Sequence, residues 1–172
     1  MSDLRTFDQS KEIGDIGQKA FKELLIQKGN KEVSLAQFTE KLVMDEEGFF
    51  TDVSKTPEFY EPDIDVILCT APRNYIRLEI KTDTLTFKTG NVFFETKLAS
   101  HAGWGLRSKA DYIIYYLPQS KVFYAINLLA LREYVESKNF EEIVCKNKED
   151  YSEGKRIPLQ PLILLGIAKE YK

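Results

Sequence analysis

Histidine and cysteine are scarce in this sequence, and their scarcity argues against whole classes of metal site. The 172 residues include one histidine and two cysteines, Cys69 and Cys145, whose separation matches no zinc-ligand spacing. Two cysteines so far apart also provide no disulfide framework of the kind that stabilises small secreted proteins. A site built from histidine and cysteine ligands is therefore not expected.

Long apolar runs are missing as well. The longest, from Leu162 to Ile167, is far shorter than the roughly 20 residues that a membrane-spanning helix needs. The first residues, Met-Ser-Asp-Leu-Arg-Thr, are polar and unlike a signal peptide. We therefore expect a cytoplasmic, intracellular protein with no membrane association. A hydrophobic content of 43% and a charged content of 30% are ordinary for a globular protein, and residues 1–172 fit a single domain.

An excess of positive charge is also absent, because the net charge is -3. The charges are unevenly distributed, however. Residues 1–65 carry 15 acidic and 8 basic side chains, a net charge of -7, whereas residues 66–172 carry 12 acidic and 16 basic side chains, a net charge of +4. A local basic face can therefore exist behind the acidic average.

The stretch from Glu61 to Lys81 predicts two strands joined by a turn. Apolar and polar residues alternate with period two on both sides of Ala71-Pro72-Arg73-Asn74, which has the composition of a turn. If the strands pair as a hairpin, four charged side chains lie on one face: Asp63, Asp65, Glu79 and Lys81. Three carboxylates so close together repel one another, and a divalent cation would remove that repulsion.

These residues resemble the motif of the PD-(D/E)XK nuclease superfamily. The likeness rests on Pro62-Asp63 with Asp65, followed after one hairpin by Glu79-Ile80-Lys81. It continues through Lys81-Thr82-Asp83, the segment from Thr89 to Glu95, and Ser108-Lys109-Ala110-Asp111-Tyr112, which are similar to phage and bacterial members. The resemblance implies an α/β fold: a single domain with a central mixed β-sheet flanked by helices and a restriction-endonuclease-like core.

The resemblance also implies roles for individual residues. Asp65, Glu79 and the main-chain carbonyl of Ile80 would bind Mg²⁺ or Mn²⁺, with Asp63 as an auxiliary ligand. Lys81 would position the attacking water or stabilise developing charge. The implied activity is that of a metal-dependent endonuclease that hydrolyses phosphodiester bonds in nucleic acid, with DNA as the expected substrate. Because no separate sequence-reading domain is visible, we expect structure-selective or weakly sequence-specific cleavage.

The first predicted helix runs from Lys11 to Lys28 and contains two glycines, Gly14 and Gly17. Glycine inside a helix costs about 1 kcal/mol relative to alanine, so we expect both to mark a close approach to a neighbouring element. Gln18 occupies the place where superfamily members often carry a glutamate facing the active site. It cannot supply a carboxylate but can orient a water; the alternative is a solvated helix flank.

Downstream of the hairpin, Asn91 to Leu98 predicts a third strand, on which Glu95 either joins the acidic face or is an ordinary exposed residue. Gly103-Trp104-Gly105 predicts a flexible frame around an aromatic that packs in the core or stacks on a base. A second hairpin is predicted from two apolar runs, Asp111 to Leu117 and Val122 to Ile126. A helix from Leu128 to Val135 is predicted to follow it. Two further segments are predicted to be strands or buried, Phe140 to Cys145 and Leu162 to Ala168. A charged connection from Lys146 to Arg156 is expected between them. The residues predicted to lie near bound nucleic acid, in addition to Gln18 and Glu95, are Lys88, Asn91, Arg107 and Lys109.

Two alternatives stay open at this point. The hairpin pattern alone is equally compatible with a solvent-facing sheet edge carrying cross-strand charge pairs. The chain could also be a catalytically inactive nuclease-fold module that binds nucleic acid or another protein. A homodimer is one option for its quaternary state. The order of the first helix, the third strand and the Ser108–Asp111 segment favours the active nuclease.

Overall fold

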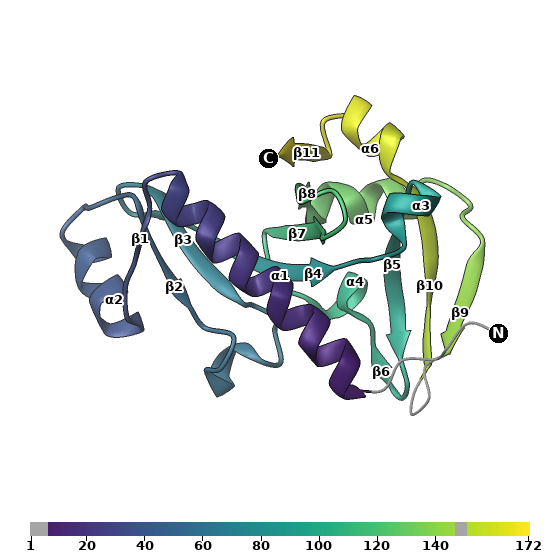
Figure 1. The fold of residues 1–172 in the computed structure, drawn as a ribbon, viewed down its shortest axis with the longest axis horizontal. Helices are drawn as coiled ribbons and strands as arrows, with labels where there is room; N and C mark the ends of the chain where they lie inside the picture. Colours follow the sequence, from purple (N-terminus) through teal and green to yellow (C-terminus); the bar gives the residue numbers. More distant parts are fainter. Residues whose placement is uncertain (1–6, 147–150) are drawn as a thin grey trace.

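The chain forms two β-sheets with helices packed around them (Figure 1). The structure is a computed structural model and describes residues 7–146 and 151–172. Within that part of the chain, the larger sheet has seven strands in the order β1-β2-β3-β4-β7-β8-β11. Their bounds are β1 Lys31–Glu32, β2 Phe49–Asp52, β3 Val66–Ala71, β4 Asn74–Thr82, β7 Tyr112–Leu117, β8 Val122–Asn127 and β11 Ala168–Tyr171. The sheet is mixed, because β1 and β2 pair in parallel, as do β4 and β7, while the other neighbours are antiparallel.

The smaller sheet is antiparallel and has the order β6-β5-β10-β9. Its strands are β5 Asn91–Leu98, β6 His101–Ala102, β9 Glu142–Lys146 and β10 Tyr151–Pro158. The helices are α1 Phe7–Gln27, α2 Leu35–Val43, α3 Thr86–Thr89, α4 Trp104–Arg107, α5 Leu128–Glu136 and α6 Leu159–Leu164, with a 3₁₀ turn η1 at Pro57–Phe59. Of the helices described, none is long and apolar enough to cross a membrane.

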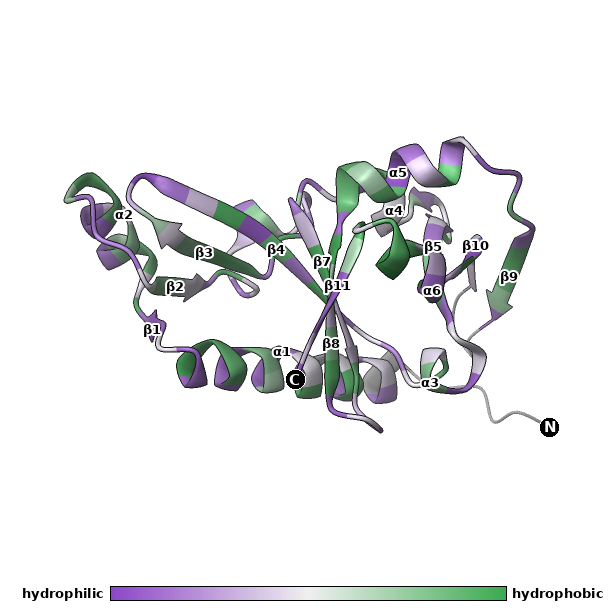
Figure 2. Cartoon of the chain, turned by 90° about the horizontal axis from the view of Figure 1, so that it is seen from above, coloured by the Kyte–Doolittle hydropathy of each residue, from purple (hydrophilic) through white to green (hydrophobic). Residues whose placement is uncertain are grey.

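Strand alternation decides which side chains face which layer. Leu78 and Ile80 on β4 pack with Phe21 and Leu25 of α1, which covers one face of the larger sheet (Figure 2). The intervening Glu79 must therefore point to the opposite face. The parallel register with β7 pairs Glu79 with Ile113 and Lys81 with Tyr115, which belong to the core between the two sheets.

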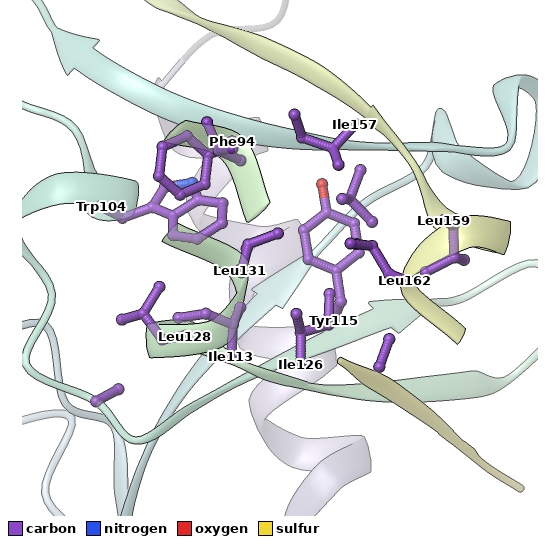
Figure 3. Packing of buried hydrophobic residues seen from close by; sticks show 14 of the residues in the cluster. Phe94, Trp104, Ile113, Tyr115, Ile126, Leu128, Leu131, Ile157, Leu159 and Leu162 are labelled. Carbon is purple, nitrogen blue, oxygen red and sulfur yellow. The ribbon is translucent and has the colours of Figure 1, made fainter. Parts of the chain in front are cut away.

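That core joins the second sheet to the first (Figure 3). Phe94 of β5 and Ile157 of β10 pack with Tyr115 and Ile126 of the larger sheet and with Leu131 of α5. Trp104 is 5% exposed and meets Phe94 edge-on, with ring centroids 5.6 Å apart. Glu79 and Lys81 thus lie at the border of the space between the two sheets.

Most predicted elements are confirmed. The first helix, both hairpins and the helix after the second hairpin form, and the first turn places Arg73 at φ 55°. The strand from Asn91 to Leu98 also forms, but it belongs to the second sheet.

One prediction near the C-terminus is wrong, and another is confirmed only in part. The charged connection from Lys146 to Arg156 instead holds most of β10, which gains hydrogen-bonding neighbours on both sides; residues 147–150 lie outside the described residues. The segment Leu162 to Ala168, predicted to be a strand or a buried segment, contributes both end residues to the core. It is not one strand, because it ends helix α6 and only begins β11.

Of the two helix glycines, only one marks a close approach. A Cβ on Gly17 would lie 1.9 Å from Oγ1 of Thr82 on β4, whereas a Cβ on Gly14 would meet nothing within 4 Å. The prediction is confirmed for Gly17 and wrong for Gly14. Gly17 therefore sets the distance at which α1 crosses β4, and with it the position of the neighbouring Gln18.

Candidate active site

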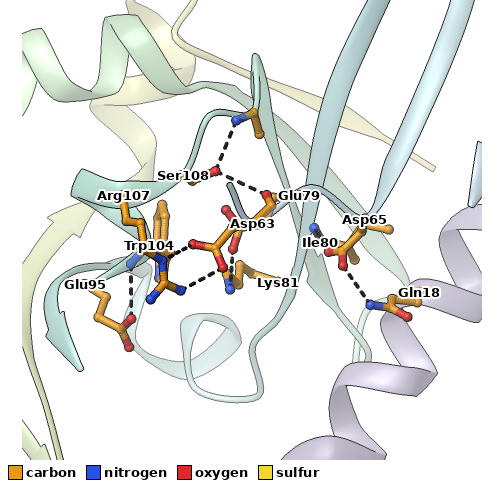
Figure 4. Close-up of polar contacts among 11 residues, drawn as sticks. Gln18, Asp63, Asp65, Glu79, Ile80, Lys81, Glu95, Trp104, Arg107 and Ser108 are labelled. Carbon is orange, nitrogen blue, oxygen red and sulfur yellow. Dashed lines mark hydrogen bonds and ion pairs between the residues drawn. The ribbon is translucent and has the colours of Figure 1, made fainter. Parts of the chain in front are cut away.

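Asp65 lies one residue before β3, where β4 continues beyond its antiparallel partner. Its N–H donates to the carbonyl of Leu78 at 2.9 Å, and its Oδ2 accepts the N–H of Ile80 at 2.7 Å. Its Oδ1 accepts a hydrogen bond from Nε2 of Gln18 at 3.1 Å (Figure 4). Gln18 therefore faces this carboxylate and is not a solvated flank position. Burial raises the pKa of Asp65, and the N–H of Ile80 and the charge of Lys81 only partly oppose that effect.

Glu79 is the most deeply buried acidic side chain of the site, at 2% exposure. Lys81 forms an ion pair with it, but neither carboxylate oxygen accepts a hydrogen bond of good geometry from the described residues. Burial raises the pKa of Glu79, while the charge of Lys81 lowers it in part. A buried carboxylate with unused acceptor capacity is costly unless something compensates it. This environment suits a cation.

Lys81 stands between Glu79 and the aromatic layer. Its Nζ lies 6.0 Å from the ring centroid of Trp104, within reach of a cation–π interaction. Burial lowers the pKa of Lys81, but the negative charges of the neighbouring carboxylates, Glu79 first, outweigh it, so the net pKa is raised. Lys81 is therefore protonated at neutral pH.

Asp63 faces Arg107, and not Asp65. Arg107 donates from Nε and Nη2 to the two carboxylate oxygens of Asp63 at 2.8 and 2.7 Å, a bidentate pair. The backbone of Asp63 has φ 51°, a left-handed conformation that aspartate tolerates better than most residues. Arg107, predicted to contact phosphate, is thus already engaged with a carboxylate, and its contact with nucleic acid stays a prediction.

The segment that carries Arg107 is held by close contacts that the sequence did not reveal. A Cβ on Gly103 or Gly105 would lie 2.6–2.7 Å from the backbone of Glu95, so these glycines are tightly packed against β5 and do not form a flexible frame. Arg132 of α5 donates from Nε to the carbonyl of Gly105 and from Nη2 to that of Ser108, both at 2.7 Å. We did not predict a role for Arg132, since an arginine on an amphipathic helix carries no distinguishing signal.

Two cavities meet at Lys81. One of about 270 Å³, here called the acidic cavity, is lined by Gln18, Asp63, Asp65, Glu79 and Lys81, together with Ile80 and aromatic side chains of the η1 region. The other, also about 270 Å³ and here called the aromatic cavity, is lined by Phe93, Trp104 and Tyr115, with Lys81 and Arg107 at its border. The structure thus brings together every predicted catalytic residue and Gln18 around one cavity.

The remaining predicted residues lie elsewhere. Glu95 accepts the N–H of Trp104 at 3.2 Å and lines the aromatic cavity, so it does not join the carboxylates of the hairpin. Asn91 donates to the carbonyl of Thr89 at 2.9 Å. Lys88 and Lys109 are exposed and line neither cavity.

The donor set of the acidic cavity fits a hard divalent cation. Asp65 and Glu79 offer carboxylate oxygens and Ile80 a main-chain carbonyl, the ligand types that Mg²⁺ prefers. In residues 7–146 and 151–172, no three histidine, cysteine, aspartate or glutamate side chains converge on one point. Two carboxylates suffice for an ion that keeps several of its waters. The strongest support for this fit is Glu79, because its buried carboxylate oxygens have no hydrogen-bond donor of good geometry among the described residues and a bound cation would compensate them.

The comparisons with known proteins give one structural likeness. No protein-family model matches this sequence, and no curated protein matches it significantly. Among solved structures, a bacterial homing endonuclease, I-Ssp6803I, aligns with a TM-score of 0.47 and 16% sequence identity, covering 73% of each chain.

Proposed function

We propose that this protein is a metal-dependent nuclease of the PD-(D/E)XK type that hydrolyses phosphodiester bonds in DNA. The observation that carries the proposal is the acidic cavity, where Asp65, Glu79 and Lys81 line one wall and Gln18 bonds to Asp65 from helix α1. A solvent-facing sheet edge would leave these groups exposed, yet Glu79 is almost fully buried. A carboxylate that is buried in a cavity although the fold does not require it is a candidate for a functional role.

Each residue of the cavity has a distinct task in this reaction. Asp65, Glu79 and the carbonyl of Ile80 would hold Mg²⁺ or Mn²⁺, which when bound supplies Lewis acidity and a more acidic water. Gln18 fixes the orientation of the Asp65 carboxylate through its amide N–H. Lys81 carries a positive charge at neutral pH, because its pKa is raised. Its charged ammonium is suited to position the attacking water or to stabilise the charge that develops on the phosphoryl oxygens.

The metal-binding test uses calorimetry with Mn²⁺ on the full chain. Asp65→Asn and Glu79→Gln should each weaken binding sharply, since each replaces an anionic ligand with a neutral side chain of the same shape. Asp15→Asn is the matched control, because Asp15 is exposed on α1. Unchanged affinity in both cavity variants would overturn the assignment.

The activity test incubates the protein with linear, nicked, single-stranded and four-way DNA, with and without Mg²⁺ or Mn²⁺. Lys81→Ala should keep DNA binding but lose cleavage. Its thermal stability without metal should fall, because the buried Glu79 carboxylate loses its ion-pair partner. Cleavage by Lys81→Ala at the wild-type rate would show that Lys81 is only a charged residue on the face of the strand and takes no part in the reaction. DNA binding without metal affinity or cleavage in the wild type would instead support a catalytically inactive binding module.

A further inference from the structure

The aromatic cavity is not explained by metal-dependent hydrolysis alone. It lies across Lys81 from the acidic cavity, with Lys81 in the wall of both. Phe93 is half-buried on β5, so the cavity reaches the protein surface. Its volume of about 270 Å³ is just below the roughly 300 Å³ at which pockets for small organic ligands begin. A flat group the size of a nucleobase fits this space.

The charges around the aromatic cavity disfavour a phosphate inside it. Its two basic residues are already paired, Lys81 with Glu79 and Arg107 with Asp63. Its two acidic residues, Asp83 and Glu95, take part in no ion pair within the described part of the chain. Asp83 is fully engaged as an acceptor, by the Tyr115 hydroxyl and two backbone N–H groups, whereas Glu95 accepts only the N–H of Trp104 through Oε1 among the described residues. The cavity therefore carries negative charge that disfavours an anion, and the second oxygen of Glu95 is its acceptor for a hydrogen-bond donor.

Apolar side chains are exposed on the short segment that follows Asp83 in the chain. Asp83 lines the cavity and also accepts the N–H groups of Leu85 and Thr86, which anchors the short segment that follows. On that segment Leu85 is 61% and Phe87 57% exposed. Exposed apolar residues beside a groove are the type that inserts between bases and unstacks them. The surroundings thus favour an unpaired strand over an intact duplex.

We propose that the aromatic cavity binds an unpaired nucleobase next to the scissile phosphate, and that it prefers a base with an exocyclic amino group over thymine. This inference rests on the proposed nuclease function, because Lys81 places the reacting phosphate beside the cavity. Phe93 supplies the stacking surface, and the carboxylate of Glu95 accepts from the amino group, as acidic side chains do from cytosine. Thymine places carbonyl oxygens on either side of its ring N–H, and these repel the carboxylate.

The first measurement is fluorescence of a nine-nucleotide thymidine strand with a central 2-aminopurine, in Ca²⁺ to suppress cleavage. Wild-type protein should quench the probe through stacking on Phe93. Phe93→Leu should bind the strand without quenching, because it keeps apolar volume but loses the ring. Phe140→Leu is the matched control, since Phe140 is also half-buried but packs against Tyr134. A probe that stays bright on the bound wild-type strand overturns the proposal.

The second measurement compares affinities for the all-thymidine strand and for the same strand with a central cytosine. The wild type should bind the cytosine strand roughly 5- to 10-fold more tightly, the size of a single good base contact. Glu95→Gln should abolish the preference, because an amide donates as well as accepts. Glu153→Gln, on the neighbouring strand β10 and outside the cavity, should keep it. Equal affinities in the wild type, or a preference that survives in Glu95→Gln, would refute the assignment.

These outcomes separate the two proposals. Metal-dependent cleavage with no quenching and no base preference would leave the nuclease in place and remove the base pocket. Quenching and a base preference without cleavage in any metal would leave the pocket in place and remove the nuclease.

Discussion

The crossing of α1 over β4 depends on the absence of a side chain at one position, and Gly17→Ala tests it. The new Cβ would lie 1.9 Å from Oγ1 and 3.2 Å from Cβ of Thr82, and 3.6 Å from Cδ1 of Tyr116. Carbon atoms pack best at roughly 3.5–4.0 Å, so α1 or Thr82 must move. A shift of α1 would also draw the amide of Gln18 away from Asp65.

The magnitude follows from two opposing effects. Overpacking a tight contact costs about 1–3 kcal/mol, and replacing glycine by alanine inside a helix returns about 1 kcal/mol. We therefore expect Gly17→Ala to lower the free energy of unfolding by up to about 2 kcal/mol. Gly14→Ala is the matched control in the same helix. Its Cβ meets nothing within 4 Å, so it should be neutral or stabilise by up to about 1 kcal/mol.

Urea denaturation of both variants measures this difference, and a double-mutant cycle locates its cause. Thr82→Ala removes the hydroxyl that Gly17→Ala would strike, and that hydroxyl is buried without a hydrogen-bond partner in the described structure. The double variant should recover most of the stability, with a coupling energy of about 1 kcal/mol or more. Mn²⁺ affinity should fall in Gly17→Ala and stay unchanged in Gly14→Ala. Equal stability of the two single variants would refute the proposed contact.

Three further predictions follow from the site. Because burial raises the pKa of Glu79, the folded state binds its proton more tightly than the unfolded state, and stability of the metal-free protein should fall as pH rises from the ordinary value of 4.5 through the raised pKa. In a pH series of melting curves, Glu79→Gln should reduce that slope and leave the part that Asp65 contributes, since burial raises the pKa of Asp65 as well. Arg132→Met leaves two carbonyls of the α4 segment without their hydrogen bonds and should lower the free energy of unfolding, measured by urea denaturation, by about 1–3 kcal/mol. Arg132→Lys should not restore it, because lysine lacks the planar guanidinium that reaches both carbonyls. Since Arg107 is paired with a carboxylate, Lys109→Ala and not Arg107→Ala should lower the salt slope of DNA binding by about one unit, and a reduced slope in Arg107→Ala alone would contradict the observed pairing.

Helices and strands could be predicted from the sequence where apolar and polar side chains alternate or repeat with a clear period. The period-two pattern around Pro72 and Arg73 predicted the hairpin, and its register puts Asp65 opposite Glu79. The polar strand β10 was missed, because its charged Lys155 and Arg156 resemble a connection. Its pairing with two neighbouring strands outweighs that local composition.

The partners of the site residues were less predictable than their positions. Asp63 and Arg107 are separated by 44 residues and pair only because α4 packs against the loop before β3. The same packing gives Arg107, a predicted phosphate contact, a carboxylate as its partner. Glu95 was expected either on the acidic face or in solvent, and it lies in neither place because β5 belongs to the second sheet.

The sequence by itself determined the hairpin, the helix α1 and the identity of the carboxylates and the lysine that line one cavity, because these depend on periodicity and on residues close along the chain. Only the tertiary structure decided that Gln18 reaches Asp65, that Glu79 is buried without adequate hydrogen bonds, and that a second cavity adjoins Lys81. Those features arise from the way α1 and the second sheet pack on opposite faces of β4. Such packing is set by contacts between residues far apart in the chain, which no local pattern encodes.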